Sequence, residues 1–272
     1  MNSTELKMID VLKDLRDNHA VAGVKAEFEA EGTRTEELMR LKEICLAAKV
    51  ALTLKIGGCE AVRDMYDART VGVNYLVAPM VETPFSLQKY LKAVDIVFPK
   101  DEQEKIEFLI NVETIMAARN FKEMLKVRGI EKLGGIVVGR VDLVGSMGLD
   151  RSACESEEIF AITRGLLGEA KRRKMTFVVG GAVSADSLSF LRRLTGEAMI
   201  DRYETRKICF SCPDALKDGA EKGITKAVAF ELLWLQNKRS FYKAIAEEDD
   251  KRITMLEARH RQAQTGQESK GA

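Results

Sequence analysis

Two acidic residues follow neighbouring apolar runs in the middle of the sequence. Glu113 closes the run IEFLINVE (residues 106–113), and Asp142 follows the run GGIVVG (134–139). If both runs are neighbouring strands of a parallel sheet, their carboxyl ends meet at the edge where such folds carry their chemistry. Two carboxylates there can hold a hard divalent cation, while water and substrate oxygens complete an octahedron. The alternative is that Asp142 is only a helix N-cap.

The segment GRVDLVGSMG (139–148) surrounds Asp142 with glycines. Glycine lets the backbone N–H groups approach a ligand closely, so oriented amides in this segment can receive the carboxylate of a substrate. Lys55 ends the run VALTLKI (50–56), where it is either a functional cation or a solvated lysine at a strand edge. Together these residues predict a binding site for an acidic small molecule.

The elements that would position these residues repeat along the chain. Short apolar runs alternate with helical patterns, which is typical of parallel strands covered on both faces. The runs predict a (β/α)8 TIM barrel whose eight strands lie within residues 21–29, 50–56, 73–79, 106–113, 134–139, 175–181, 198–204 and 207–210. Between the seventh and eighth runs there is no room for a helix.

Helical segments flank the predicted barrel. An amphipathic helix occupies the N-terminus, and with it the barrel spans residues 1–213. A helical extension follows over 214–264, with expected breaks near Gly223 and Asn237, and residues 265–272 read as a disordered tail. The apolar residues of the extension need a cover, either the bottom of the barrel or a second subunit, so the sequence favours a homo-oligomer formed through these helices.

The amino-acid composition limits the classes of partner and substrate that this protein is expected to bind. Lysine and arginine (43) balance aspartate and glutamate (42), so nothing indicates a nucleic acid or an anionic membrane as partner, and a small-molecule substrate is expected. The absence of a long apolar run predicts a cytoplasmic protein. Five cysteines suit a reducing compartment, and the lone CxxC of Cys209 and Cys212 is read as buried thiols before zinc or redox chemistry.

Three segments together resemble the HpcH/HpaI aldolase and citrate lyase beta-subunit family of barrels that act on pyruvate- and phosphoenolpyruvate-type substrates. They are VNYLVAPMVETPFSLQKYL, FLINVETIMAARN and GGIVVGRVDLVGSMGLD, and the likeness covers residues 24–150. The resemblance implies that Glu113 and Asp142 bind Mg²⁺ or Mn²⁺. It also implies that the amides of Gly139, Arg140, Val141 and Asp142 receive the carboxylate of a 2-oxo acid.

The implied reaction makes or breaks a carbon–carbon bond, because the cation stabilises a pyruvate-type enolate by neutralising its charge. Two positions depart from the family pattern. Ala30 stands where the aldolase branch has a catalytic histidine, and Lys55 stands where the family has an arginine. We therefore expect Lys55 to stabilise the enolate as a charge, with Glu29 beside it as base or ion-pair partner. The alternative role for Lys55 is a Schiff base with a keto group.

Two arginines are further candidates. Arg206 in RYETRK either binds a phosphate or carboxylate of the second substrate or belongs to an ion-pair cluster, and Arg140 could select an acidic substrate. The alternatives to an aldolase are a citrate lyase-like acyl or CoA-ester lyase, an enzyme that uses phosphoenolpyruvate, and an inactive barrel that serves as a binding or assembly protein.

Overall fold

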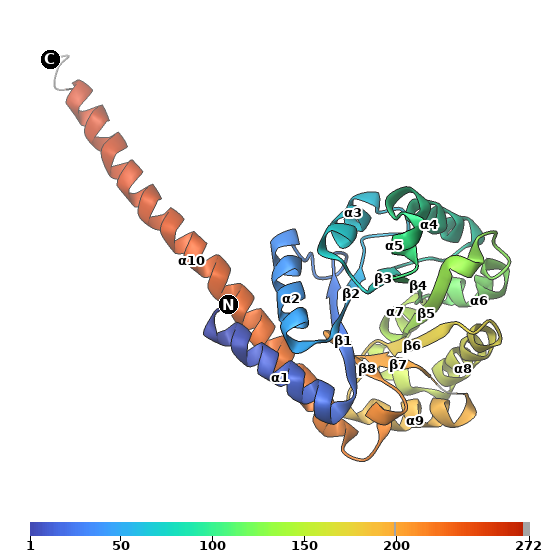
Figure 1. Cartoon of the computed structure of the whole chain (residues 1–272). Helices are drawn as coiled ribbons and strands as arrows, with labels where there is room; N and C mark the ends of the chain where they lie inside the picture. Colours follow the sequence, from blue (N-terminus) through green and yellow to red (C-terminus); the bar gives the residue numbers. More distant parts are fainter. Residues whose placement is uncertain (199, 269–272) are drawn as a thin grey trace.

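Each strand of the protein pairs with its neighbours in sequence, from β1 round to β8 and back to β1, so the sheet closes into a barrel. The computed structural model describes residues 1–198 and 200–268 (Figure 1). The strands are β1 (Val21–Glu27), β2 (Ala51–Lys55), β3 (Tyr75–Ala78), β4 (Glu107–Val112), β5 (Leu133–Gly139), β6 (Thr176–Gly180), β7 (Arg202–Glu204) and β8 (Ile208–Ser211). Each predicted run contains or overlaps one of them, which confirms the predicted barrel.

Helices surround the barrel between most successive strands (Figure 1). They are α1 (Ser3–His19), α2 (Thr35–Ala48), α3 (Val62–Val71), α4 (Pro84–Val97), α5 (Lys100–Gln103), α6 (Ile115–Met124), α7 (Arg140–Ser146), α8 (Glu157–Arg172), α9 (Leu188–Glu197) and α10 (Ala220–Glu268). Four short 3-10 helices lie in the connections: η1 (Ile130–Lys132), η2 (Arg151–Glu155), η3 (Ala185–Ser187) and η4 (Asp214–Leu216).

The last strand departs from a regular (β/α)8 barrel. β1 to β7 are parallel, whereas β8 is antiparallel to both β7 and β1. The cause is visible in the sequence, because a parallel neighbour needs a crossover of a dozen or more residues and only three separate β7 from β8. The turn of this hairpin, residues 205–207, therefore lies at the same end of the barrel as the carboxyl ends of β1 to β6.

The strands are apolar on both faces because both faces are buried. One face packs under the helices in the main core, and the other fills the barrel with Val77, Leu109, Val137 and Val178. Inward positions on the remaining strands carry polar side chains instead. This polar sector lies on β1, β2, β7 and β8. It continues towards the carboxyl ends of the strands, where the candidate site lies.

The C-terminal extension is one continuous helix of 49 residues, so the expected breaks near Gly223 and Asn237 are wrong. Gly223 lies against His19 of α1, where an added Cβ would come within 3.1 Å of the His19 Cβ. Asn237 exchanges side-chain hydrogen bonds with Asn2 and Glu5. Both residues serve the packing of α10 on α1 and do not end the helix.

The helix also extends beyond the expected start of a disordered tail at residue 265, because α10 ends at Glu268. Residues 269–272 of that predicted tail lie outside the described part of the chain. Within the described residues, the structure contains no helix that is both long and apolar enough to cross a membrane. The first half of α10 packs on the barrel, where Phe230 and Trp234 are buried.

Candidate active site at the barrel mouth

Glu113 lies at the point where β4 turns into α6. Thr114 is the N-cap of α6, and its hydroxyl accepts a hydrogen bond from the amide of Ala117 (3.1 Å), which fixes the turn directly after Glu113. The Glu113 side chain is almost fully buried. Its Oε1 accepts a hydrogen bond from the backbone N–H of Met80 (3.0 Å), and its Oε2 accepts one from Asn111 Nδ2 (2.7 Å). The carboxylate is thus held in one orientation.

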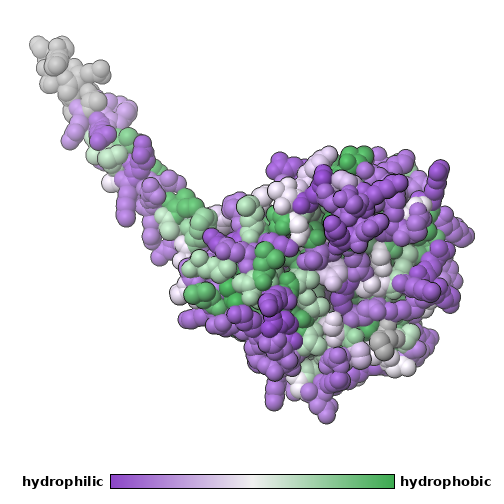
Figure 2. Space-filling model, viewed as in Figure 1, coloured by the Kyte–Doolittle hydropathy of each residue, from purple (hydrophilic) through white to green (hydrophobic). Residues whose placement is uncertain are grey.

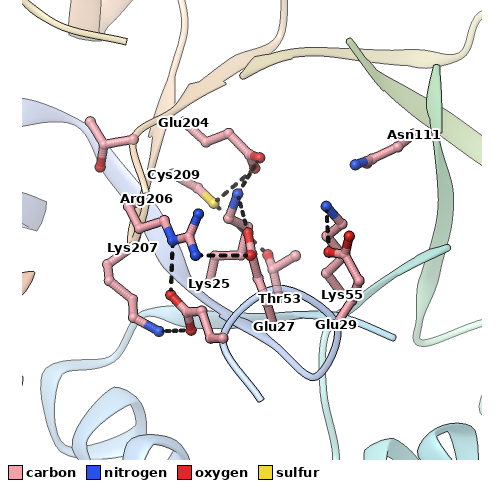
Figure 3. A network of polar contacts seen from close by, with 12 residues as sticks. Lys25, Glu27, Glu29, Thr53, Lys55, Asn111, Glu204, Arg206, Lys207 and Cys209 are labelled. Atoms are coloured by element: carbon pink, nitrogen blue, oxygen red, sulfur yellow. Dashed lines mark hydrogen bonds and ion pairs between the residues drawn. The ribbon is translucent and has the colours of Figure 1, made fainter. Parts of the chain in front are cut away.

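Lys55 is the last residue of β2 and reaches the same place. Its Nζ lies 2.9 Å from Oε2 of Glu29 (Figure 3). It also lies 3.7 Å from Oε2 of Glu113. The expected pairing of Lys55 with Glu29 is confirmed. Burial lowers the pKa of Lys55, but the charges of Glu113, Glu29 and Glu27 outweigh it and the net pKa is raised. Lys55 is therefore a buried ammonium group at neutral pH.

Asp142 lies in the first turn of α7, beside Glu113. The pKa of Glu113 is raised, mainly by burial, and the charge of Asp142 raises it further, against the opposing effects of Lys55, Met80 and Asn111. The charge of Asp142 thus opposes the ionisation of Glu113. The N-cap of α7 is Gly139, which has no capping side chain, so the alternative that Asp142 caps the helix is wrong.

The backbone amides at the start of α7 lie against the loop that follows β6. A Cβ added to Gly181, just after β6, would lie 2.6 Å from the amide nitrogen of Arg140 and 2.7 Å from that of Val141. Both distances are too short for a carbon–nitrogen contact, so only a residue without a Cβ lets the backbone after β6 approach these amides so closely. A Cβ on Gly139 would meet Oε2 of Glu113 at 2.8 Å. Gly139 and Gly181 therefore let the backbone at the start of α7 pack tightly beside Glu113 and the loop after β6.

The side chain of Arg140 is fully buried and its guanidinium is bound by protein groups, so the expectation that it selects an acidic substrate is wrong. Its guanidinium donates to the carbonyl oxygens of Gly180 (3.2 Å) and Gly181 (2.9 Å) and to Oε1 of Glu155 (2.8 Å). It also lies 4.8 Å from the ring centroid of Phe190. Arg140 anchors the loop after β6 and thereby positions Gly181.

Arg206 lies in the β7–β8 turn at the mouth and belongs to a cluster of ion pairs, which was the alternative to phosphate binding. Its Nε lies 3.2 Å from Oε1 of Glu31, and its terminal nitrogen lies 3.8 Å from Oε2 of Glu27 (Figure 3). Lys207 binds the other carboxylate oxygen of Glu31. About half of the Arg206 side chain stays exposed, so its free face borders the mouth.

A buried charge network below the mouth was not recognised in the sequence. Lys25 Nζ lies 2.6 Å from Oε1 of Glu204 and 3.0 Å from Oε1 of Glu27 (Figure 3). Burial lowers the pKa of Lys25, but these two carboxylates outweigh it and the pKa is raised. A signal existed, because Lys25 and Glu27 are two residues apart on a strand and so share one face, here the interior of the barrel.

Asn111 is a second residue that sequence reasoning missed. It is buried on β4, and its Oδ1 has no hydrogen-bond partner among the described residues, whereas its Nδ2 holds Glu113. A buried carbonyl oxygen without a partner is costly, and it faces the same part of the barrel as the Glu113 carboxylate. A bound cation or water would satisfy it.

The donor set at the mouth fits a magnesium or manganese ion. Glu113 and Asp142 supply hard carboxylate oxygens from neighbouring elements, and their mutual repulsion is the kind that a divalent cation removes. No group of three or more His, Cys, Asp or Glu residues forms a metal-binding cluster in the described part of the chain. The fit therefore rests on two carboxylates, with the remaining positions left to water and substrate.

The chain's two histidines lie outside the site. His19 ends α1 and contacts Gly223 of α10, and His260 is exposed near the end of α10. The five cysteines are free, and burial raises the pKa of the Cys209 and Cys212 thiols to about 12, which opposes a redox role. The acid–base groups at the mouth are thus carboxylates and Lys55.

The closed barrel and its charged mouth define the class: a TIM-type barrel protein with an enzyme-like site at the carboxyl ends of its strands. The sequence profile of the HpcH/HpaI aldolase/citrate lyase family matches residues 34–188, more than half of the chain. The protein belongs to this family, which indicates an aldolase- or citrate lyase-type enzyme. The match contains Lys55, Glu113 and Asp142, whereas Glu29 and Arg206 lie outside it.

Solved structures share the fold at low sequence identity. An HpcH/HpaI aldolase from Desulfitobacterium hafniense is 13% identical with a TM-score of 0.57, and the alignment covers 71% of this chain and 80% of that one. The citrate synthase SbnG is 14% identical with a TM-score of 0.59, covering 86% and 90%. A family protein from Burkholderia cenocepacia is 13% identical with a TM-score of 0.56, covering 72% and 81%. No curated protein matches the sequence.

Proposed function

We propose that this protein is a divalent-metal-dependent carbon–carbon lyase of the aldolase type, acting on a 2-oxo acid of the pyruvate or oxaloacetate kind through an enolate. The observation that carries the proposal is the approach of Lys55 Nζ to within 3.7 Å of the buried carboxylate of Glu113. A buried cation and a buried acid at the carboxyl ends of barrel strands are typical of a site that handles developing negative charge.

Different residues of the chain would bind the metal and the substrate. Glu113 and Asp142 would hold Mg²⁺ or Mn²⁺, which when bound supplies Lewis-acid neutralisation of the charge that forms on the keto oxygen. The amides of Gly139, Arg140 and Val141 receive the substrate carboxylate at the start of α7. This arrangement orients the 2-oxo acid beside the acidic residues before any bond changes.

Lys55 remains protonated and stabilises the enolate electrostatically, in the position where the family has an arginine. Its raised pKa and its ion pairs disfavour a Schiff base, which needs a neutral amine. Glu29, held 2.9 Å from Lys55, is the base that removes a proton from the carbon next to the keto group. The electron pair of that C–H bond then moves into the enolate.

Two other functions would give different results in a test of metal binding and turnover. A citrate lyase-like enzyme would use the site on an acyl or CoA ester, and an inactive barrel would serve as a binding or assembly protein. The observation that favours the inactive barrel is that neither histidine of the chain lies at the mouth. Retained metal binding together with turnover distinguishes an enzyme from an inert barrel.

The deciding experiment follows the methyl protons of pyruvate by proton NMR in deuterated buffer, with the protein and Mg²⁺ and again with EDTA. Exchange that occurs only with Mg²⁺ supports the proposal, because it requires a metal-dependent enolate. Exchange that persists in EDTA contradicts metal dependence. No exchange in either sample, with no Mn²⁺ bound in a direct binding measurement, favours the inert barrel.

A further inference from the structure

No other element among residues 1–198 and 200–268 covers the second half of α10. The helix packs on α1 and the barrel through its first part and then projects away from the barrel as a single rod (Figure 1). The space-filling view shows apolar side chains among the charged ones along this rod (Figure 2). Most of the stability of a helix in a protein comes from packing an apolar face against a partner, so an uncovered apolar stripe calls for one.

An exposed apolar stripe on α10 follows the spacing of a coiled coil. Starting at Val228, alternate steps of four and three residues give a series of ten positions. The series reads Val228, Leu232, Leu235, Arg239, Tyr242, Ala246, Asp249, Ile253, Leu256 and His260. This spacing of a and d positions over more than four heptads is the pattern of a two-helix seam.

These positions are on the free side of the helix. The exposed fractions of the large aliphatic members are 59% for Val228, 55% for Leu232, 51% for Leu235, 52% for Ile253 and 47% for Leu256. The side of α10 that faces α1 and the barrel carries a different set, with Phe230 and Trp234 buried. Tyr242 lies at the border, since its hydroxyl bonds Glu36 and Arg34 lies over its ring. The stripe thus needs a second partner besides the barrel.

We infer that this stripe binds the same stripe of a second copy of the chain, in an antiparallel coiled coil with its twofold axis at residue 244. That axis pairs Leu232 with Leu256 and Leu235 with Ile253 across the interface. It also pairs Tyr242 with Ala246. Two apolar pairs therefore lie on each side of the axis, and Val228 meets His260 at each end of the seam.

The two charged residues of the seam favour a second copy of the chain as the partner, in the antiparallel orientation. In the antiparallel pair, Arg239 of one chain meets Asp249 of the other, twice per dimer, so the charges are complementary. A parallel pair in register would place Arg239 against Arg239 and Asp249 against Asp249, which is repulsive. Ile245, which is also exposed, lies next to its own copy at the axis of the antiparallel pair.

The seam is long enough for a stable pair. From Val228 to His260 it covers 33 residues, or about 50 Å of helix at 1.5 Å per residue. The two barrels then lie on opposite sides of the axis, because each packs along the first half of its own α10. The inference does not depend on the proposed lyase activity.

The test is a charge-swap cycle on the full-length protein, measured by sedimentation equilibrium. The wild type should be a dimer in the low micromolar range. Arg239→Asp and Asp249→Arg should each raise the dimer dissociation constant at least about tenfold, and the double swap should bring it back towards the wild-type value. Recovery in the double swap is specific to the antiparallel pair, because a parallel pair keeps like charges opposed in all four proteins.

Lys251→Asp is the matched control, since it makes the same charge change as Arg239→Asp at an exposed position outside the seam. It should leave the dissociation constant unchanged, and circular dichroism should show intact helix in every variant. A monomeric wild type, or single swaps that have no more effect than the Lys251 control, would overturn the inference. A double swap that fails to recover would overturn the antiparallel arrangement.

Discussion

The ammonium nitrogen of Lys55 lies 3.7 Å from Oε2 of Glu113, and 2.9 Å from Oε2 of Glu29 on the other side. Lys55 therefore joins two carboxylates that come from the loops after β4 and β1. The contact with Glu113 passes over β3, from the end of β2 to the end of β4. This triad is the centre of the candidate site.

Replacing Lys55 tests whether its charge matters. Lys55→Ala should lower kcat by about 10²- to 10³-fold, the usual effect of losing one group that stabilises an oxyanion. Lys55→Arg should restore part of the activity, because it restores the cation. Lys126→Ala, on an exposed lysine of the surface, is the control and should leave kcat unchanged. Failure of the arginine variant, together with a borohydride-trapped substrate adduct on wild-type Lys55, would establish the Schiff base instead.

Asp142→Asn tests the proposed metal site. The Asp142 side chain is exposed, so its replacement should change the free energy of unfolding by no more than about 0.5 kcal/mol. The Mn²⁺ affinity and the turnover should both fall at least about 100-fold. Calorimetric titration with Mn²⁺ measures the affinity. Asp218→Asn removes an exposed aspartate before α10 and should change neither quantity. Full activity in Asp142→Asn would remove Asp142 from the site.

Gly181→Ala tests whether the Arg140 and Val141 amides receive the substrate carboxylate. Gly181 has φ of +81°, and the new Cβ would lie 2.6 Å and 2.7 Å from these two amide nitrogens, so it would displace both amides and KM for the 2-oxo acid should rise at least about tenfold. Gly219→Ala is closely matched, because Gly219 has φ of +87° with nothing near its Cβ position. Gly219→Ala should lose about 1 kcal/mol of stability from backbone strain, and Gly181→Ala should lose more, because its Cβ also collides with the backbone of α7. Only Gly181→Ala should change KM. Equal KM values would contradict the proposed carboxylate position.

Arg140→Met should act on stability first. The variant leaves the carbonyl oxygens of Gly180 and Gly181 without their donor and Glu155 without its cation, so the free energy of unfolding should fall by about 3 kcal/mol. Urea denaturation measures this change. Arg151→Met, on an exposed arginine of η2, should change it by less than about 0.5 kcal/mol. A fully stable Arg140 variant with altered substrate preference would restore the selectivity role.

Glu27 gives the fold a dependence on acid pH. Burial raises the pKa of Glu27, but Lys25, Lys55 and Arg206 outweigh it and the net pKa lies below the ordinary value of 4.5. The unfolded state therefore binds the proton more readily, so the contribution of Glu27 to stability is complete above about pH 4.5 and is lost as the pH falls through the folded-state pKa.

Glu27→Gln should consequently destabilise the protein by about 1–3 kcal/mol at neutral pH, with Lys25 keeping Glu204 as its second partner. The difference from wild type should shrink as the pH is lowered below about 4.5. Urea unfolding at a series of pH values measures it, and the exposed Glu104→Gln is the control. A difference that stays constant down to acid unfolding would contradict this role for the Glu27 charge.

The sequence by itself determined the barrel, the metal-ligand candidates and the family. Near-continuous apolar runs are a local consequence of burial on both faces, so they could be read strand by strand, and Glu113 and Asp142 were found because acids directly follow two such runs. The short link between β7 and β8 likewise made a parallel eighth strand impossible, although its antiparallel direction became visible only in the structure.

Only the tertiary structure decided where long side chains point. Arg140 directs its guanidinium to the loop after β6 and not to the mouth, because two carbonyl oxygens and Glu155 satisfy it there. The Lys25–Glu27–Glu204 network joins β1 to β7, a contact between residues about 180 positions apart that no local pattern records. The continuity of α10 through Gly223 was decided in the same way, since packing on His19 outweighs the low helix propensity of glycine.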